Sequence, residues 1–489
     1  MKHNRTMNRR TIIKGTGALG AISLAVSTDA EKSAGTTRLH ALSPRSAGIY
    51  EEIYQKVQAT PFIDTHEHLM EERDRIKGIP HSRIKSDDWT LLFDGYLSAE
   101  MISAGMPYDI NRKFFSPDID PLDKWIYLEP YWHAIKNTGY GQTTRIAIKE
   151  LYGIDQVSSR TIKSIQDGYE RIRKPGFYKY ILRDCANIES CHVDCRTGKP
   201  FEESGMPTLL MQDIYVTGMF SGTDVDMYLK PTGMKVNSLY DWHKVIDWWF
   251  DKYGKYAVAA KSTNAYGRNI DYDDIPAKDV EVIFTKKMNH YSLTESEQKA
   301  LEDHLFWYIA RKATGSGLPV KIHTGYYTGT NGMPLSRVSR NAASAADICR
   351  ISPTTRFIFM HICYPYYEDL LAVAKHYTNA YVDMCWSWII NPIAAKDFLK
   401  KYIMTAPLNK LLTFGGDYVH VEPVLGHAII ARHGIVQALT ELVEEDWLSL
   451  DDALELTDPI MHGNARKIFN LREKEELLKQ APWAGKAAD

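Results

Sequence analysis

Histidine and carboxylate side chains in this 489-residue chain stand directly after short apolar stretches. The first such place reads Pro61-Phe62-Ile63-Asp64-Thr65-His66-Glu67-His68. If this stretch is a strand, the i, i+2 spacing of His66 and His68 points both imidazoles to the same face. Three more stretches end in the same way, in Val320-Lys321-Ile322-His323, in Phe357-Ile358-Phe359-Met360-His361 and in Leu412-Thr413-Phe414-Gly415-Gly416-Asp417. Imidazole and carboxylate groups suit Zn, Mn or Fe, so we expect a divalent metal site with Zn as the first choice.

A lysine ends one further apolar stretch, Ala257-Val258-Ala259-Ala260-Lys261. An ammonium group beside a divalent cation is repelled unless it pairs with an anion. We expect Lys261 to act in the site. The alternative is a lysine that extends its ammonium to solvent at the end of its strand.

These residues require strands that end at one common edge. Eight short apolar strands are predicted, and segments with helical periodicity separate most of them. The strands cover residues 61–68, 188–195, 208–216, 256–261, 318–323, 356–361, 380–386 and 411–417. Eight strands alternating with helices predict an α/β fold, the closed (β/α)8 or TIM barrel. Chemistry in that fold collects at the C-terminal strand ends, where the histidines, Lys261 and Asp417 are found.

The segment between the first two predicted strands, about residues 69–187, is far too long for a loop. Trp125, Leu128, Trp132 and Ile135 recur in it at helical spacing. We therefore predict a helical insertion packed over the barrel. Residues 44–489 then form one barrel domain, although the length alone suggests about three domains.

The first 43 residues have a different character. A basic segment with the pair Arg9-Arg10 is followed by Thr11-Ile12-Ile13-Lys14, a short weakly apolar run and small residues up to Ala30. This order is typical of an export signal, and the run is too short to anchor the chain in a membrane. The string is similar to a twin-arginine signal, which would carry the folded protein to the periplasm. The alternative is a disordered tail on a cytoplasmic protein.

The charge balance is nearly even, with 59 basic and 61 acidic side chains and a formal net charge of −2. It gives no electrostatic reason to expect nucleic acid as a partner. Hydrophobic residues make up 44% of the chain, enough for a large packed core. We expect a globular enzyme with a small-molecule substrate, either as a monomer or as a homo-oligomer.

The strand-end residues resemble those of the amidohydrolase superfamily, whose barrels carry H-x-H on the first strand, His on the fifth and sixth, and Asp on the eighth. The likeness is greatest to the amidohydrolase-2 group, which includes uronate isomerases and the nodulin-like domains fused to some glutamine synthetases. The likeness covers about residues 45–475 and includes the motifs Lys261-Ser262, Tyr364-Pro365-Tyr366 and Asn137-Thr138-Gly139-Tyr140-Gly141.

This resemblance implies that His66, His68, His323 and Asp417 hold one or two divalent ions. Asp417 would also transfer a proton, and His361 would bind a second metal or polarise a substrate carbonyl. Lys261 matches a lysine that bridges two metals when it is carboxylated. In other members a basic group near the site binds a substrate carboxylate instead.

Aromatic and basic residues next to the strand ends are expected to contact the substrate. Tyr266 and Arg268 follow the fourth strand and would bind an acidic group. Tyr326 and Trp386 would form walls of the pocket, and His420 is a further candidate. The alternative for each aromatic residue is plain packing.

We expect a metal-dependent hydrolase in which a metal-activated water cleaves an amide, ester or related bond of a small substrate, one that can carry a carboxylate. The same residues would serve a metal-dependent decarboxylase or a uronate-isomerase-like enzyme. An exported metal-binding barrel without catalytic activity is the third alternative.

Overall fold

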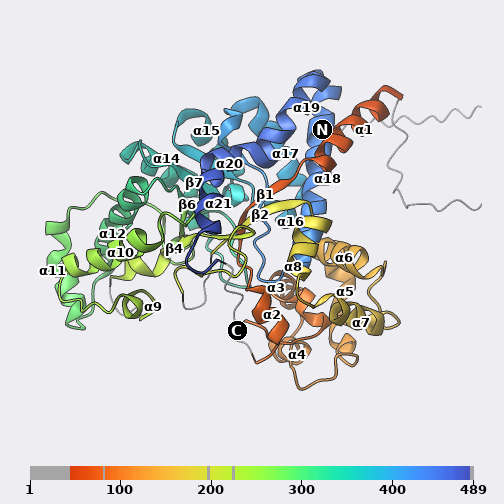
Figure 1. The fold of residues 1–489 in the computed structure, drawn as a ribbon, viewed down its shortest axis with the longest axis horizontal. Helices are drawn as coiled ribbons and strands as arrows, with labels where there is room; N and C mark the ends of the chain where they lie inside the picture. Colours follow the sequence, from red (N-terminus) through yellow and green to blue (C-terminus); the bar gives the residue numbers. More distant parts are fainter. Residues whose placement is uncertain (1–43, 81–82, 195–198, 223–225, 485–489) are drawn as a thin grey trace, which may run out of the picture. The chain divides into compact units, whose positions relative to one another are not determined.

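A computed structural model describes residues 44–80, 83–194, 199–222 and 226–484 (Figure 1). The predicted export signal, residues 1–43, lies outside the described residues. The strands are β1 (Phe62–Glu67), β2 (Ile188–Val193), β3 (Leu210–Gln212), β4 (Ile214–Tyr215), β5 (Ala260–Ser262), β6 (Val320–His323), β7 (Phe357–Met360), β8 (Ala380–Asp383) and β9 (Leu411–Leu412). Because β3 and β4 are two halves of one predicted strand, the eight predicted strand positions are confirmed.

The strands form two parallel sheets, with the orders β1-β2-β3 and β4-β5-β6-β7-β8-β9. Backbone hydrogen bonds join the two sheets at both junctions. The N–H of Val258 donates to the carbonyl of Gln212 over 2.9 Å, and the N–H of Thr65 donates to that of Phe414 over 3.0 Å. The eight strand positions therefore follow one another around a ring, as the barrel prediction requires.

The barrel strands are buried because helices cover their outer faces. All four residues of β7 are apolar and buried, the pattern expected for a strand of a parallel sheet. β6 buries one charge, Lys321, whose Nζ donates to Oδ2 of Asp213 over 2.8 Å inside the barrel. The outer helices include α10 (Leu239–Tyr253), α12 (Glu295–Gly315), α14 (Asn341–Ile351), α15 (Tyr367–His376) and α17 (Pro392–Thr405).

Several strands end earlier than their apolar patterns predict. β7, β8 and β9 stop before residues 361, 386 and 417, which the predicted strands include. His361, Trp386 and Asp417 have φ angles of 62°, 64° and 61°. A left-handed backbone cannot continue a strand. It therefore ends β7 directly at His361, whereas β8 and β9 end three and five residues before Trp386 and Asp417.

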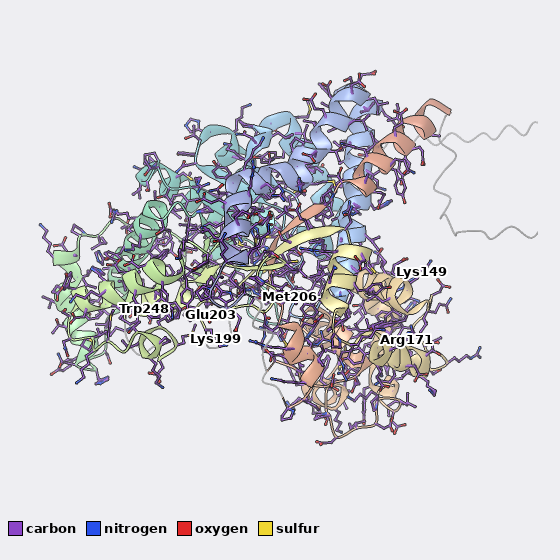
Figure 2. The ribbon with its side chains drawn as sticks, viewed as in Figure 1. Lys149, Arg171, Lys199, Glu203, Met206 and Trp248 are labelled. Carbon is purple, nitrogen blue, oxygen red and sulfur yellow. The ribbon has the colours of Figure 1, made fainter. Side chains whose placement is uncertain are left out.

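The predicted insertion between β1 and β2 is a group of short helices (Figure 1). They are α2 (Glu72–Lys77), α3 (Tyr96–Ser103), α4 (Tyr108–Phe114), α5 (Trp125–Ile135), α6 (Gly139–Tyr152), α7 (Ile162–Ile172) and α8 (Phe177–Lys179). α7 buries Ile165 and Tyr169 and exposes Arg171. Figure 2 shows Arg171 and Lys149 of α6 on the outer surface of the insertion. The helices are therefore amphipathic, as their periodicity predicts.

A long helix, α18 (Glu422–Glu444), connects the insertion to the barrel. It packs against α1 (Pro44–Ala59), α6 and α17, and most of its residues are buried. A Cβ at Gly426 would lie 2.1 Å from the carbonyl oxygen of Thr143 in α6, so glycine allows the two helix backbones to approach. Neither α18 nor any other helix in the described part of the chain has the length and apolar character of a membrane span.

Candidate metal centre

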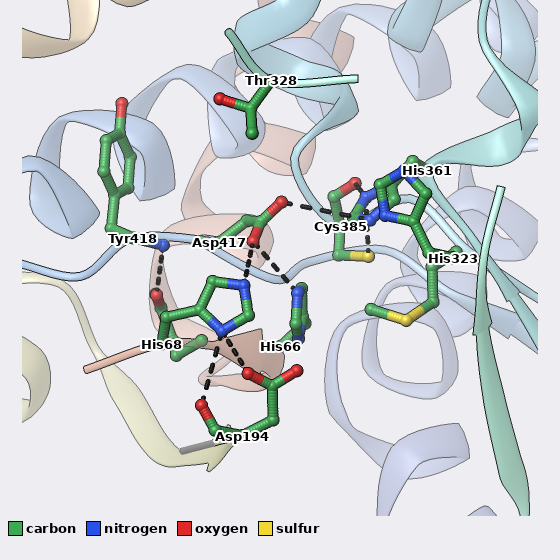
Figure 3. A network of polar contacts seen from close by, with 12 residues as sticks. His66, His68, Asp194, His323, Thr328, His361, Cys385, Asp417 and Tyr418 are labelled. Carbon is green, nitrogen blue, oxygen red and sulfur yellow. Dashed lines mark hydrogen bonds and ion pairs between the residues drawn. The ribbon is translucent and has the colours of Figure 1, made fainter. Parts of the chain in front are cut away.

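Four side chains converge at the C-terminal ends of the barrel strands (Figure 3). Nε2 of His66 and Nε2 of His68 each lie 3.0 Å from Oδ1 of Asp417. Nε2 of His361 lies 4.0 Å from Oδ2 of the same carboxylate. His66, His361 and Asp417 offer ligand atoms that lie within 4.8 Å of one another, close enough to share a metal ion.

Two histidines of this cluster, His66 and His361, are fully buried, and burial favours their neutral form. Burial and the nearby Lys261 ammonium lower the pKa of His66 well below its usual value. Burial also lowers the pKa of His361 to about 4. A neutral imidazole offers a lone pair, which is the form that binds a metal. Within the described residues, Nε2 of His361 is buried without a hydrogen-bond partner, as expected for a nitrogen that awaits a ligand.

Asp417 is ionised although it is buried. Burial opposes the charge, but contacts with His66 and His68 hold the pKa of Asp417 well below its usual range. One carboxylate and three imidazole nitrogens form a donor set that suits a divalent cation, so the residues present fit a metal ion.

The backbone around Asp417 is bonded to β1, the strand that also carries His66. The N–H of Asp417 donates to the carbonyl of His66 over 2.9 Å. The flanking bonds run from Gly416 N to Asp64 Oδ1 over 3.2 Å and from Tyr418 N to Glu67 Oε2 over 2.6 Å. β1 therefore supplies a histidine of the cluster and also fixes the carboxylate that faces it.

His323 and Lys261 lie beside the cluster. The ring centroid of His323 is 4.4 Å from that of His361, but Nε2 of His323 lies 3.0 Å from the carbonyl oxygen of Tyr326. Lys261 is fully buried, with Nζ 2.6 Å from Sδ of Met360. The structure thus brings together His66, His68 and Asp417 of the predicted ligands and adds His361, while His323 faces the loop after its own strand.

Asp194 is a site residue that the sequence analysis missed. It follows β2 directly, and its carboxylate contacts Nδ1 of His68. His66, His68 and Asp194 form a second group with ligand atoms within 4.8 Å. The only signal in the sequence is an acid at the end of a predicted strand, without a second ligand at a recognisable spacing.

Two neighbouring cavities open beside this cluster. One of about 350 Å³ is lined by His68 and Asp417. Its other walls include Tyr266 and His420, which we predicted as substrate contacts, and three residues that we did not predict, Arg83, Lys85 and Tyr96. The second, of about 440 Å³, shares Tyr96 and Thr328 with the first and is lined by the predicted Tyr326.

The other two predicted substrate contacts have different surroundings. Trp386 is fully buried and stacks on Tyr96 with ring centroids 4.9 Å apart. It therefore supports the cavity wall from behind. Arg268 forms ion pairs with Glu302 over 2.9 Å and with Asp303 over 2.5 Å, both on α12. Its charge is balanced there, and Arg268 is not among the residues that line these two cavities.

Known proteins share parts of this chain. A family model described as Amidohydrolase matches residues 288–471, which contain His323, His361 and Asp417. Protein fluG of Emericella nidulans is 22% identical over 228 residues, which make up 44% of this chain and 26% of fluG. The match thus spans about a quarter of the length of that relative.

Solved structures resemble the chain over most of its length. A glucuronate isomerase from Caulobacter crescentus has a TM-score of 0.70 and 17% identity, covering 91% of this chain and 97% of that one. A uronate isomerase from Thermotoga maritima has a TM-score of 0.68 and 14% identity, covering 86% and 97%. At such identities the likeness shows the fold alone. The family-model match and this shared fold are thus both similarities to amidohydrolase-type proteins.

Proposed function

We propose that this protein is a metal-dependent hydrolase acting on a small molecule in the cavity beside Asp417. The observation that supports this most is the approach of three imidazole nitrogens to one buried carboxylate. His66, His68, His361 and Asp417 would hold the ion, with Zn as the first choice and Mn or Fe as alternatives. When bound, the ion would polarise the substrate and make a water nucleophilic near neutral pH.

Asp417 is the residue placed to move a proton. It lines the cavity, and its Oδ1 lies between the imidazoles of His66 and His68. A carboxylate in this position can take the proton of the attacking water and return it to the leaving group. The hydroxyl of Tyr96 donates to the backbone carbonyl of Asp417, so a helix of the insertion helps to fix the proton-transfer group.

The substrate is proposed to carry a carboxylate. Arg83 and Lys85 lie on the wall of the same cavity as His68 and Asp417. A guanidinium group such as that of Arg83 beside the reacting centre favours an anionic substrate. Lys85 also binds Asp94 over 2.6 Å, which leaves the local charge moderate.

A uronate-isomerase-like reaction is the second candidate. The uronate and glucuronate isomerase structures cover 86% and 91% of this chain, and this observation favours it. With so large a share of the chain covered, the likeness must include part of the insertion. Asp417 would then move a proton between two carbons of a sugar acid, and no water would be consumed.

Isotope labelling of the products separates the two reactions. The metal content of the full-length protein is measured first, and panels of amides, esters and uronates are then incubated in H₂¹⁸O and in D₂O. A hydrolase places one ¹⁸O in the product at the cleaved bond, whereas an isomerase places deuterium on carbon and no ¹⁸O. Release of CO₂, with deuterium on the carbon that has lost the carboxylate, would favour a decarboxylase. A protein that binds the metal but turns over none of these substrates would favour the non-catalytic metal-binding alternative, and a protein that binds no metal would contradict all of these functions.

A further inference from the structure

The two ring nitrogens of His68 have different partners (Figure 3). Nε2 lies 3.0 Å from Oδ1 of Asp417, whereas Nδ1 contacts Oδ1 of Asp194 and lies 3.4 Å from the Asp194 backbone carbonyl. A carbonyl oxygen and an ionised carboxylate can only accept hydrogen bonds. A neutral imidazole with its proton on Nδ1 can donate to Asp194, and its Nε2 lone pair then points toward Asp417.

The barrel backbone fixes the place of Asp194. The N–H of Asp194 donates to the carbonyl of Glu67 over 3.0 Å, and Glu67 is the neighbour of His68 in the chain. On the other side, the N–H of Asp213 donates to the carbonyl of Val193 over 2.9 Å. Asp194 is fully buried and His68 is 5% exposed. The carboxylate is therefore held against the histidine by strand pairing on both sides of β2.

From this geometry we propose that Asp194 is a positioning residue, whose carboxylate accepts the Nδ1 proton of His68 and directs Nε2 toward the metal position. The inference rests on the proposed function, because it treats His68 as a metal ligand. Carboxylates that bind the second ring nitrogen of a metal-bound histidine fix the ring orientation and strengthen the ligand.

A direct ligand role for Asp194 is the competing explanation. His66, His68 and Asp194 lie close enough for a second ion. However, a ring nitrogen that donates its proton to Asp194 cannot bind a metal at the same time. The two explanations differ in stoichiometry, since a positioning residue alters the affinity of an ion and a ligand alters the number of ions.

The test measures zinc binding by the full-length protein in competition with a chromophoric chelator. We expect Asp194→Ala to weaken zinc binding about 10- to 100-fold without changing the number of ions bound. Asp194→Asn should weaken it less, because the amide oxygen can still accept the Nδ1 proton. Glu189→Gln is the matched control: Glu189 lies at the other end of β2 and contacts Nε2 of His462 over 2.6 Å, so affinity should stay unchanged.

Two further readouts guard against a general loss of structure. Thermal melting establishes that each variant is folded, and the visible absorption of the Co²⁺-loaded protein reports on the ligands. We expect the cobalt band to shift in Asp194→Asn but not in Glu189→Gln.

An unchanged affinity and an unchanged cobalt band in the Asp194 variants would overturn the inference. Loss of one ion, with the other bound as in the wild type, would also overturn it and make Asp194 a ligand. A wild-type protein that binds no metal would instead refute the proposed function, and the inference with it.

Discussion

Two buried carboxyl groups, Asp64 and Glu67, hold the backbone on both sides of Asp417. Burial raises the pKa of Asp64 to about 7, and burial together with Asp64 raises that of Glu67 well above its usual value. At neutral pH the pair therefore retains a proton, which reduces repulsion between the two groups and toward Asp417. Residues that never touch the substrate thus set the position and the electrostatic surroundings of the proton-transfer group.

Replacing Asp417 by Asn tests its chemical role. We expect kcat to fall by about 10²- to 10⁴-fold, the usual contribution of a general acid–base group. The melting temperature of the metal-free protein should change little, because asparagine tolerates a left-handed backbone. Asp446→Asn is a matched control, since Asp446 is exposed and has a φ of 60°. Retention of turnover in Asp417→Asn would exclude the proton-transfer role.

A histidine pair remote from the site predicts acid sensitivity. Nε2 of His243 on α10 lies 3.0 Å from Nε2 of His304 on α12. Burial and His304 lower the pKa of His243 to about 4, whereas an unfolded histidine titrates near 6.5. The unfolded chain therefore binds more protons between these values, and the stability from neutral His243 is lost as pH falls from about 6.5 toward 4.

Urea denaturation at pH 7.5 and pH 5.0 measures this effect. Below a pH of about 6.5 the stability falls by about 1.4 kcal/mol per pH unit. By pH 5.0, His243 should therefore account for about 2 kcal/mol of the stability lost. His243→Gln should remove that part of the loss, and His376→Gln, at an exposed position on α15, should not. An equal loss in the wild type and in His243→Gln would contradict the prediction.

At the scale of elements, α2 at the start of the insertion is tied to α18 by a buried ion pair. Nη2 of Arg75 donates to Oε1 of Glu422 over 2.7 Å, and Nη1 donates to Oε2 over 3.0 Å. Both side chains are almost completely buried. Glu422 stands five residues after Asp417 in the chain, so the pair connects the insertion to the segment that leaves the site.

Removal of one partner of this ion pair should lower the free energy of unfolding much more than replacement of both partners. Arg75→Ala leaves the Glu422 carboxylate buried and unpaired, which costs about 3–5 kcal/mol. The double variant Arg75→Met, Glu422→Leu should recover most of that loss, because an apolar pair of similar volume often replaces a buried ion pair without penalty. Free energies of unfolding in urea check both values, and a single variant as stable as the wild type would be the contrary result.

The elements differ in how well the sequence predicts them. The barrel strands are predictable because buried parallel strands leave uninterrupted apolar runs such as Phe357–Met360. His66, His68 and Asp417 follow from their places at strand ends. The partner of His323 could not be predicted, because it depends on the path of the loop through Tyr326. Asp194 could not be selected either, since only strand pairing reveals its contact with His68.

At the scale of the whole molecule, the cavity beside Asp417 is built by two parts of the chain. Tyr96 comes from the insertion, whereas Tyr266 and Tyr418 come from segments that follow barrel strands. Neither part encloses the cavity alone. Substrate selection therefore depends on how the insertion packs on the barrel, which Arg75–Glu422 and the close approach at Gly426 both fix.

We propose that residues 1–43 export the protein after folding, which would allow the metal to be loaded before transport. Changing Arg9 and Arg10 to lysine should leave the protein in the cytoplasm, because a twin-arginine signal depends on the guanidinium pair. Cell fractionation followed by immunoblotting measures the distribution, with Arg5→Lys as the control. An unchanged periplasmic fraction in the double variant would contradict export by this route.

The left-handed residues at three strand ends bear on how such a protein changes over evolution. A non-glycine residue in this backbone region costs roughly 1–3 kcal/mol, a large amount beside the 5–15 kcal/mol that stabilises a typical domain. Glycine at position 361 or 417 would relieve the strain and abolish the cluster. A lineage that no longer used the reaction would have no reason to keep this strained backbone. Glycine at these two positions should therefore mark descendants that have lost the activity, before any assay is made.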